Sequence, residues 1–212
     1  MFALAASSIA CLLAEFYRLC PMRAFTLFVF LPALAGLAAL SLADLIWGDG
    51  RLWRGVTIGV ASGLIAAGAY DIFRLPFVFA QPWGIDWIVP PLNLFKVFPA
   101  FGSLILGEPS PQRHYSLAAH LFGWAYHFSN GVGFGIMYVA LIGIPQRRHW
   151  GWAVLFAMGL EAAMLLMPYP QLFSIRVTPA FVMITLMAHF IFGVVMGLLT
   201  KVLAARPQPD GH

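Results

Sequence analysis

Long apolar stretches alternate with short turns rich in Gly, Pro, Asp and Arg along most of this sequence. A mostly apolar run of about 18 residues or more is typical of a helix that crosses a lipid bilayer. The pattern predicts a marginal first segment over residues 1–20, followed by helices over residues 24–47, 54–74, 115–143, 150–168 and 179–203.

Residues 75–114 interrupt this pattern, because seven prolines alternate there with Trp and Phe. Prolines at this density exclude one continuous helix. Irregular backbone at membrane depth is tolerated where protein or a water-lined cavity covers it. We therefore expect an interfacial or re-entrant segment, with a short helix near residues 92–106, that covers the bundle as a lid. An inert interfacial hairpin is the alternative.

The composition supports a membrane protein, with 61% hydrophobic and 9% charged residues. Soluble domains contain roughly 45–50% apolar and about 25% charged residues. The predicted fold is an all-α, polytopic bundle of five or six transmembrane helices. Residues 1–205 form its single domain, and the polar residues 206–212 form a disordered tail.

The net charge of +4 comes from basic residues in short loops. Such clusters set membrane orientation and face the cytoplasm, so they do not indicate a nucleic-acid partner. This rule places the C-terminus in the cytoplasm and, in a bacterium, the protein in the inner membrane; it rests on Arg51, Arg54, Arg147, Arg148 and Lys201. Arg18 and Arg23 fall on the opposite side, and a span through residues 85–107 would reverse the later helices.

Small residues recur every fourth position in two of the predicted helices. Gly55, Gly59 and Gly63 form one such stripe, and Gly193 and Gly197 form another. These stripes let helices approach closely. They predict tight packing inside the bundle, or contacts within a homo-oligomer or a larger membrane complex.

Residues 115–143 contain no Asp, Glu, Lys or Arg, yet carry polar side chains within an apolar run. Ionisable groups at membrane depth are costly and usually functional. With a rise of about 1.5 Å per residue, five such groups fall in the outer half of the bilayer. They come from four helices and are Asp71, His120, His127, Glu161 and His189.

His120 and His127 are seven residues apart and share a helix face. Together with Glu161 and His189 they could bind zinc or iron, although no close-spaced ligand motif is present. Alternatively, the same groups relay protons, or His127 and His189 hold a haem as axial ligands.

A purely structural role remains open, in which these groups satisfy one another as interhelical hydrogen bonds. Tyr126, Ser129 and Asn130 would support such a network. Asp71 and Arg74 are three residues apart, so we expect an ion pair that gates the outer mouth.

These residues predict a multi-pass membrane protein that binds a metal ion or transports protons or other ions. The alternatives are a membrane-embedded, metal-dependent hydrolase or oxidoreductase, and a structural or accessory subunit of a larger membrane complex, with or without a haem bound to the subunit. The sequence does not decide whether the protein is an enzyme.

Overall fold

The computed structural model describes residues 1–205, and this part of the chain contains helices without strands. The all-α prediction is therefore confirmed. The predicted disorder of residues 206–212 lies outside the described residues.

The chain begins with two short helices, α1 (Phe2–Ala5) and α2 (Ser7–Phe16). A longer, uninterrupted helical segment follows them. It consists of α3 (Met22–Phe25), the π-helical turn η1 (Thr26–Phe30) and α4 (Leu31–Trp47).

The remaining helices build the body of the molecule. They are α5 (Arg51–Val78), α6 (Val97–Leu106), α7 (Leu117–Ile142), the 3-10 turn η2 (Pro145–Arg147), α8 (Gly151–Leu166), α9 (Tyr169–Leu172) and α10 (Pro179–Ala205).

Three helical segments are long and apolar enough to cross a membrane: Met22–Trp47, Arg51–Val78 and Pro179–Ala205. Helix α7 has 26 residues but is not one of them, because its His, Asn and Gly residues lower its mean hydropathy. Helices α2, α6 and α8 are apolar but shorter. The apolar helices are compatible with a lipid bilayer, and the five or six spans stay a prediction.

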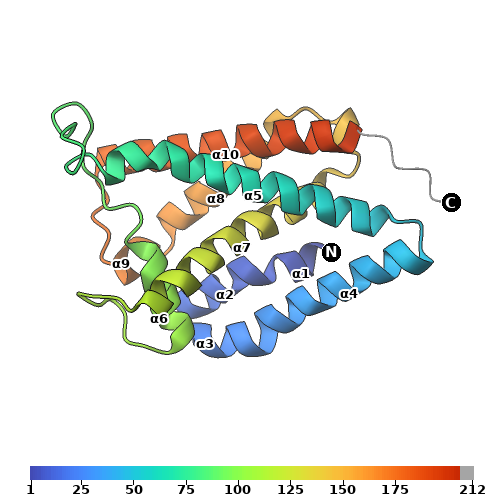
Figure 1. Ribbon diagram of the computed structural model, residues 1–212, viewed down its shortest axis with the longest axis horizontal. Helices are drawn as coiled ribbons and strands as arrows, with labels where there is room; N and C mark the ends of the chain where they lie inside the picture. Colours follow the sequence, from blue (N-terminus) through green and yellow to red (C-terminus); the bar gives the residue numbers. More distant parts are fainter. Residues whose placement is uncertain (206–212) are drawn as a thin grey trace.

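Helix α7 occupies the centre of the bundle and packs against α5 and α6 (Figure 1). A Cβ atom at Gly59 would lie 2.6 Å from the Cα of Ile136, and one at Gly63 would collide with the carbonyl of Gly131. On the other side of the bundle, a Cβ at Gly193 would lie 2.6 Å from the Cα of Val154 in α8. Both predicted small-residue stripes therefore form close helix contacts within the chain.

The start of the proline-rich segment differs from the prediction, which ended the preceding helix at residue 74. Helix α5 continues through Pro76 to Val78, and it tolerates this proline because Pro76 lies in its last turn. Turns and loops follow, and α6 then packs onto the first turns of α7. Gly102 meets the Ala119 carbonyl and Gly123 meets the Phe98 carbonyl, so a side chain at either glycine would prevent this contact.

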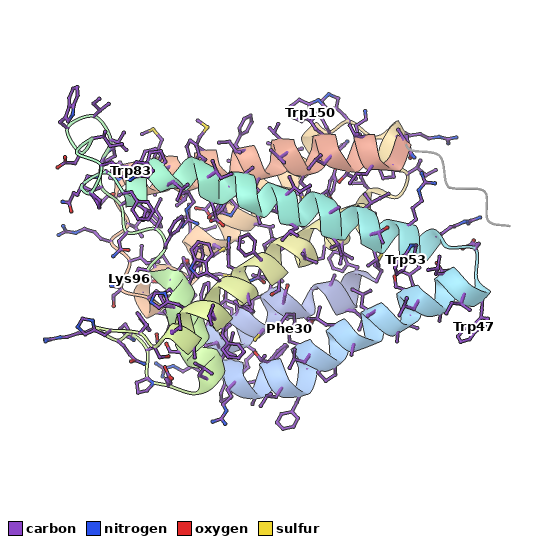
Figure 2. All side chains as sticks on the ribbon, in the orientation of Figure 1. Phe30, Trp47, Trp53, Trp83, Lys96 and Trp150 are labelled. Atoms are coloured by element: carbon purple, nitrogen blue, oxygen red, sulfur yellow. The ribbon has the colours of Figure 1, made fainter. Side chains whose placement is uncertain are left out.

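The basic loops meet at the end of the bundle opposite α6. Arg54 donates a hydrogen bond from Nη2 to the carbonyl of Ala204 over 2.7 Å, and the Gln146 amide donates to the same oxygen. This contact joins the start of α5, the end of α10 and the turn before α8. Figure 2 shows Trp47 and Trp53 toward this end, and Lys96 and Trp83 toward the other.

Candidate functional site

A cavity of about 440 Å³ lies among α5, α7, α8 and α10, toward the end at which α6 packs. Small-molecule sites typically occupy roughly 300–1,000 Å³. Residues 91–98, from the proline-rich segment, form part of its wall. The walls are largely apolar, with Leu12, Phe101, Phe134, Leu160, Met164, Phe181 and Phe192 among them.

On one side of the cavity, Arg74 of α5 and His127 of α7 line the wall, and Asp71 of α5 joins them. His127 Nε2 lies 2.8 Å from Asp71 Oδ2, and Arg74 Nη1 lies 3.4 Å from Asp71 Oδ1. Asp71 is 7% exposed and Arg74 is 3% exposed. The spacing of three residues on α5 thus forms the expected ion pair, and α7 adds an imidazole to it.

Helix α6 holds the imidazole of His127 in place. The Phe98 ring stacks on it with a centroid distance of 4.2 Å and an interplanar angle of 27°. The contact depends on the close approach at Gly123, which brings Phe98 down onto α7. A stacked ring with a carboxylate at one nitrogen has little freedom to rotate.

The opposite wall carries a second histidine–carboxylate pair. His189 Nδ1 of α10 lies 3.2 Å from Glu161 Oε2 of α8 and 3.0 Å from the Thr185 carbonyl oxygen. A carbonyl only accepts hydrogen bonds, so Nδ1 carries the proton, and Nε2 is the nitrogen without one when the imidazole is neutral. Glu161 is 4% exposed.

Tyr70 connects the two pairs. Its ring centroid lies 6.0 Å from that of His127 and 5.0 Å from that of His189. The Arg74 guanidinium lies over the same ring, 4.6 Å from its centroid. The two histidines thus share one aromatic neighbour, although they belong to different helices.

Cationic side chains gather where the cavity meets the proline-rich segment. Arg74 Nη2 donates to the carbonyl of Leu94, which ties this segment to α5, while its buried Nε has no hydrogen-bond partner among residues 1–205. Lys96 and Arg176 also line the cavity and are exposed. These three cations lie at the mouth of a cavity whose walls are largely apolar.

Tyr169 of α9 lines the same mouth. Its ring packs against Phe16 and Phe173, with centroid distances of 5.7 and 5.3 Å. Burial raises the pKa of the Tyr169 hydroxyl. The phenol is therefore neutral over the physiological pH range and can donate a hydrogen bond.

The structure separates the polar residues predicted on α7. His127 and Asn130 line the cavity, and the structure gives the buried Oδ1 of Asn130 no hydrogen-bond partner within the part of the chain that it describes. His120 is exposed and lies outside the cavity. Tyr126 donates to the Ser8 carbonyl over 2.6 Å, and Ser129 donates to the carbonyl of Tyr126 over 2.7 Å.

The predicted metal ligands do not form one cluster. Within residues 1–205, no group of three or more His, Cys, Asp or Glu side chains is arranged to hold a metal ion. His120 lies apart, and His127 and His189 each pair with a carboxylate of their own. Zinc, iron and haem stay predictions.

Several residues of the site carried no role in the sequence prediction. Tyr70 and Thr185 sit one residue before Asp71 and four before His189, so their positions on the same helices were the available signal. Lys96 is the sole cation among residues 75–112, an isolated charge in an apolar and aromatic segment. Nothing in the sequence pattern pairs Phe98 with His127.

A family model matches residues 93–211, which is more than half of the chain. The match covers α6 to α10, with the whole Glu161–His189 pair and His127, whereas Asp71 and Arg74 lie before it. No curated protein and no solved structure matches the chain. The chain belongs to the family of unknown function DUF6789.

Proposed function

We propose that this multi-pass membrane protein transports protons by way of the two histidine–carboxylate pairs in its cavity. One observation carries the proposal: four helices each contribute one member of two buried pairs that border the same cavity. Buried ionisable groups at membrane depth usually mark a proton or ion route.

Each imidazole has one nitrogen engaged by an acceptor and a second nitrogen that can exchange a proton. Histidine changes charge near neutral pH, which suits a proton carrier. Adding a proton to the Glu161–His189 pair cancels the buried negative charge of Glu161. Adding a proton to His127 places a positive charge beside Asp71, whose negative charge Arg74 already balances. The two pairs therefore hold a proton in different electrostatic surroundings.

The three long apolar helices, together with α7 and α8, would form the spans of the bundle. With the basic loops in the cytoplasm of the cell, the cavity opens toward the outer side. The close contacts of Gly59 and Gly63 with α7 seal the other half. Transport would then require α5 and α7 to move apart in the cytoplasmic half.

The test is proton flux into liposomes that contain the purified protein and an entrapped pH dye. A potassium gradient with valinomycin sets the membrane potential. Wild-type protein should carry more protons than empty liposomes do, and Glu161→Gln and His189→Gln should each reduce the flux to the level of empty liposomes.

Two matched controls separate the cavity from the rest of the chain. Asp86 is an exposed carboxylate in the loop before α6, and His120 is an exposed histidine on the same helix as His127. Asp86→Asn and His120→Gln should keep the wild-type flux. The proposal would be overturned by wild-type flux no greater than that of empty liposomes, or by undiminished flux in Glu161→Gln. If the protein is an accessory subunit, the wild type should give no more flux than empty liposomes do.

A further inference from the structure

The cavity is wider and more apolar than proton exchange requires. A proton route needs a line of hydrogen-bonding groups, but most side chains around these roughly 440 Å³ are aliphatic or aromatic. This volume falls in the lower part of the range for organic ligands. The walls therefore suit an organic molecule with a substantial apolar part.

The cavity is also elongated along the helices. On α10 its lining runs from Phe181 to Phe192. Eleven residues of helix correspond to about 16 Å, which is longer than a compact cavity of about 440 Å³ would be. A narrow, extended molecule fits this shape better than a compact one.

Charge is concentrated at one end of the long axis. Three cationic side chains, those of Arg74, Lys96 and Arg176, border the mouth. Only two carboxylates, Glu161 and Asp71, lie nearby, so positive charge is in excess even when both imidazoles are neutral. Guanidinium groups favour carboxylate and phosphate oxygens. The mouth is therefore complementary to an anion.

Two buried polar atoms of the lining lack partners in the described part of the chain. They are Nε of Arg74, which is 3% exposed, and Oδ1 of Asn130, which is 9% exposed. Buried polar groups are almost always hydrogen-bonded. Both atoms are fully enclosed by protein, so a bound molecule can pair with them only if the Arg74 and Asn130 side chains turn toward the cavity.

We propose that the cavity binds a single-chain amphiphile with an anionic oxygen head, either a carboxylate or a phosphate. The head group binds at Arg74, Lys96 and Arg176, and the chain lies along Phe134, Leu160 and Phe192. This inference goes beyond proton transport and does not depend on it.

Binding is measured by native mass spectrometry of the full chain released from micelles of a non-ionic maltoside detergent. The probes are palmitate, hexadecyl phosphate and hexadecanol, which share one chain and differ in the head. Palmitate or hexadecyl phosphate should bind one per chain, and hexadecanol should bind at least about tenfold more weakly. The tighter of the two anions identifies the head group.

Variants at the mouth test the head-group contacts. Lys96→Gln and Arg176→Gln change exposed side chains, so they leave the fold intact, and together they should weaken anion binding at least about tenfold. Arg148→Gln, at an exposed arginine near the opposite end of the bundle, should bind as wild type does. Leu160→Trp fills the cavity and should abolish binding, with the thermal unfolding midpoint as the check on folding.

Absence of one-to-one binding by both anions would overturn the proposal. Equal binding of hexadecanol and palmitate, or unchanged affinity in the Lys96→Gln, Arg176→Gln double variant, would also overturn it. Tight anion binding without proton flux would support the amphiphile site and refute proton transport. Proton flux without anion binding would support proton transport and refute the amphiphile site.

Discussion

The buried ion pair between Asp71 and Arg74 should contribute far more to stability than the exposed pair between Asp49 and Arg51. The exposed pair is the shorter one, at 2.8 Å against 3.4 Å, but its side chains are 58% and 89% exposed. If burial rather than distance decides, Asp71→Asn and Asp49→Asn will differ widely.

The structure sets the size of the difference. Asp71→Asn keeps an oxygen that accepts the hydrogen bond from His127, but it leaves the Arg74 guanidinium buried without its counter-charge. Removing one partner of a buried pair costs about 3–5 kcal/mol. Removing one partner of an exposed pair costs less than about 1 kcal/mol.

The assay is the free energy of unfolding in mixed bicelles, from denaturant titrations followed by circular dichroism. A double variant, Asp71→Asn with Arg74→Met, removes the orphaned charge and should recover at least about 2 kcal/mol relative to Asp71→Asn alone. If Asp49→Asn costs as much as Asp71→Asn, or if the double variant is as unstable as the single one, burial does not decide the strength of these ion pairs.

Two further predictions concern packing and metal. Gly135→Leu should lower the unfolding free energy by about 1–3 kcal/mol, because its Cβ would lie 2.9 Å from the Cα of Gly63. Gly36→Leu is the control: no atom lies within 4 Å of the Cβ position, so this substitution should be neutral or stabilising. Elemental analysis and an absorption spectrum of detergent-purified protein decide the metal and haem hypotheses. If the two histidine–carboxylate pairs act without a cofactor, zinc and iron will lie far below one per chain and no haem band will appear, whereas a stoichiometric metal or a haem band would confirm the metal or haem hypothesis.

Depth predicted that five ionisable groups would gather in the outer half of the bilayer. In the structure His127, Glu161 and His189 line one cavity and Asp71 pairs with His127, whereas His120 lies outside it. Burial drives this result, because polar groups in an apolar helix are stabilised only when they face one another or a cavity. The glycine stripes on α5 and α10 followed from their spacing in the same way.

Which groups pair, and which fall outside, could not be predicted from periodicity. His120 shares a helix face with His127 but lies about 10 Å farther along α7, beyond the helices that enclose the cavity, so it is exposed. The stacking of Phe98 on His127 depends on how α6 packs after a long irregular segment. Helix spacing carries no information about such a contact between separate helices.

The most direct test of proton exchange is nitrogen NMR of histidine-labelled protein in lipid nanodiscs over a range of pH. Signals are assigned with His127→Gln and His189→Gln, and the exposed His120 serves as an internal reference. We expect His127 and His189 each to gain and lose a proton reversibly while the protein stays folded, and in His189 the exchange should occur at Nε2. Either histidine remaining in one protonation state throughout, or exchange at Nδ1 of His189, would contradict this expectation.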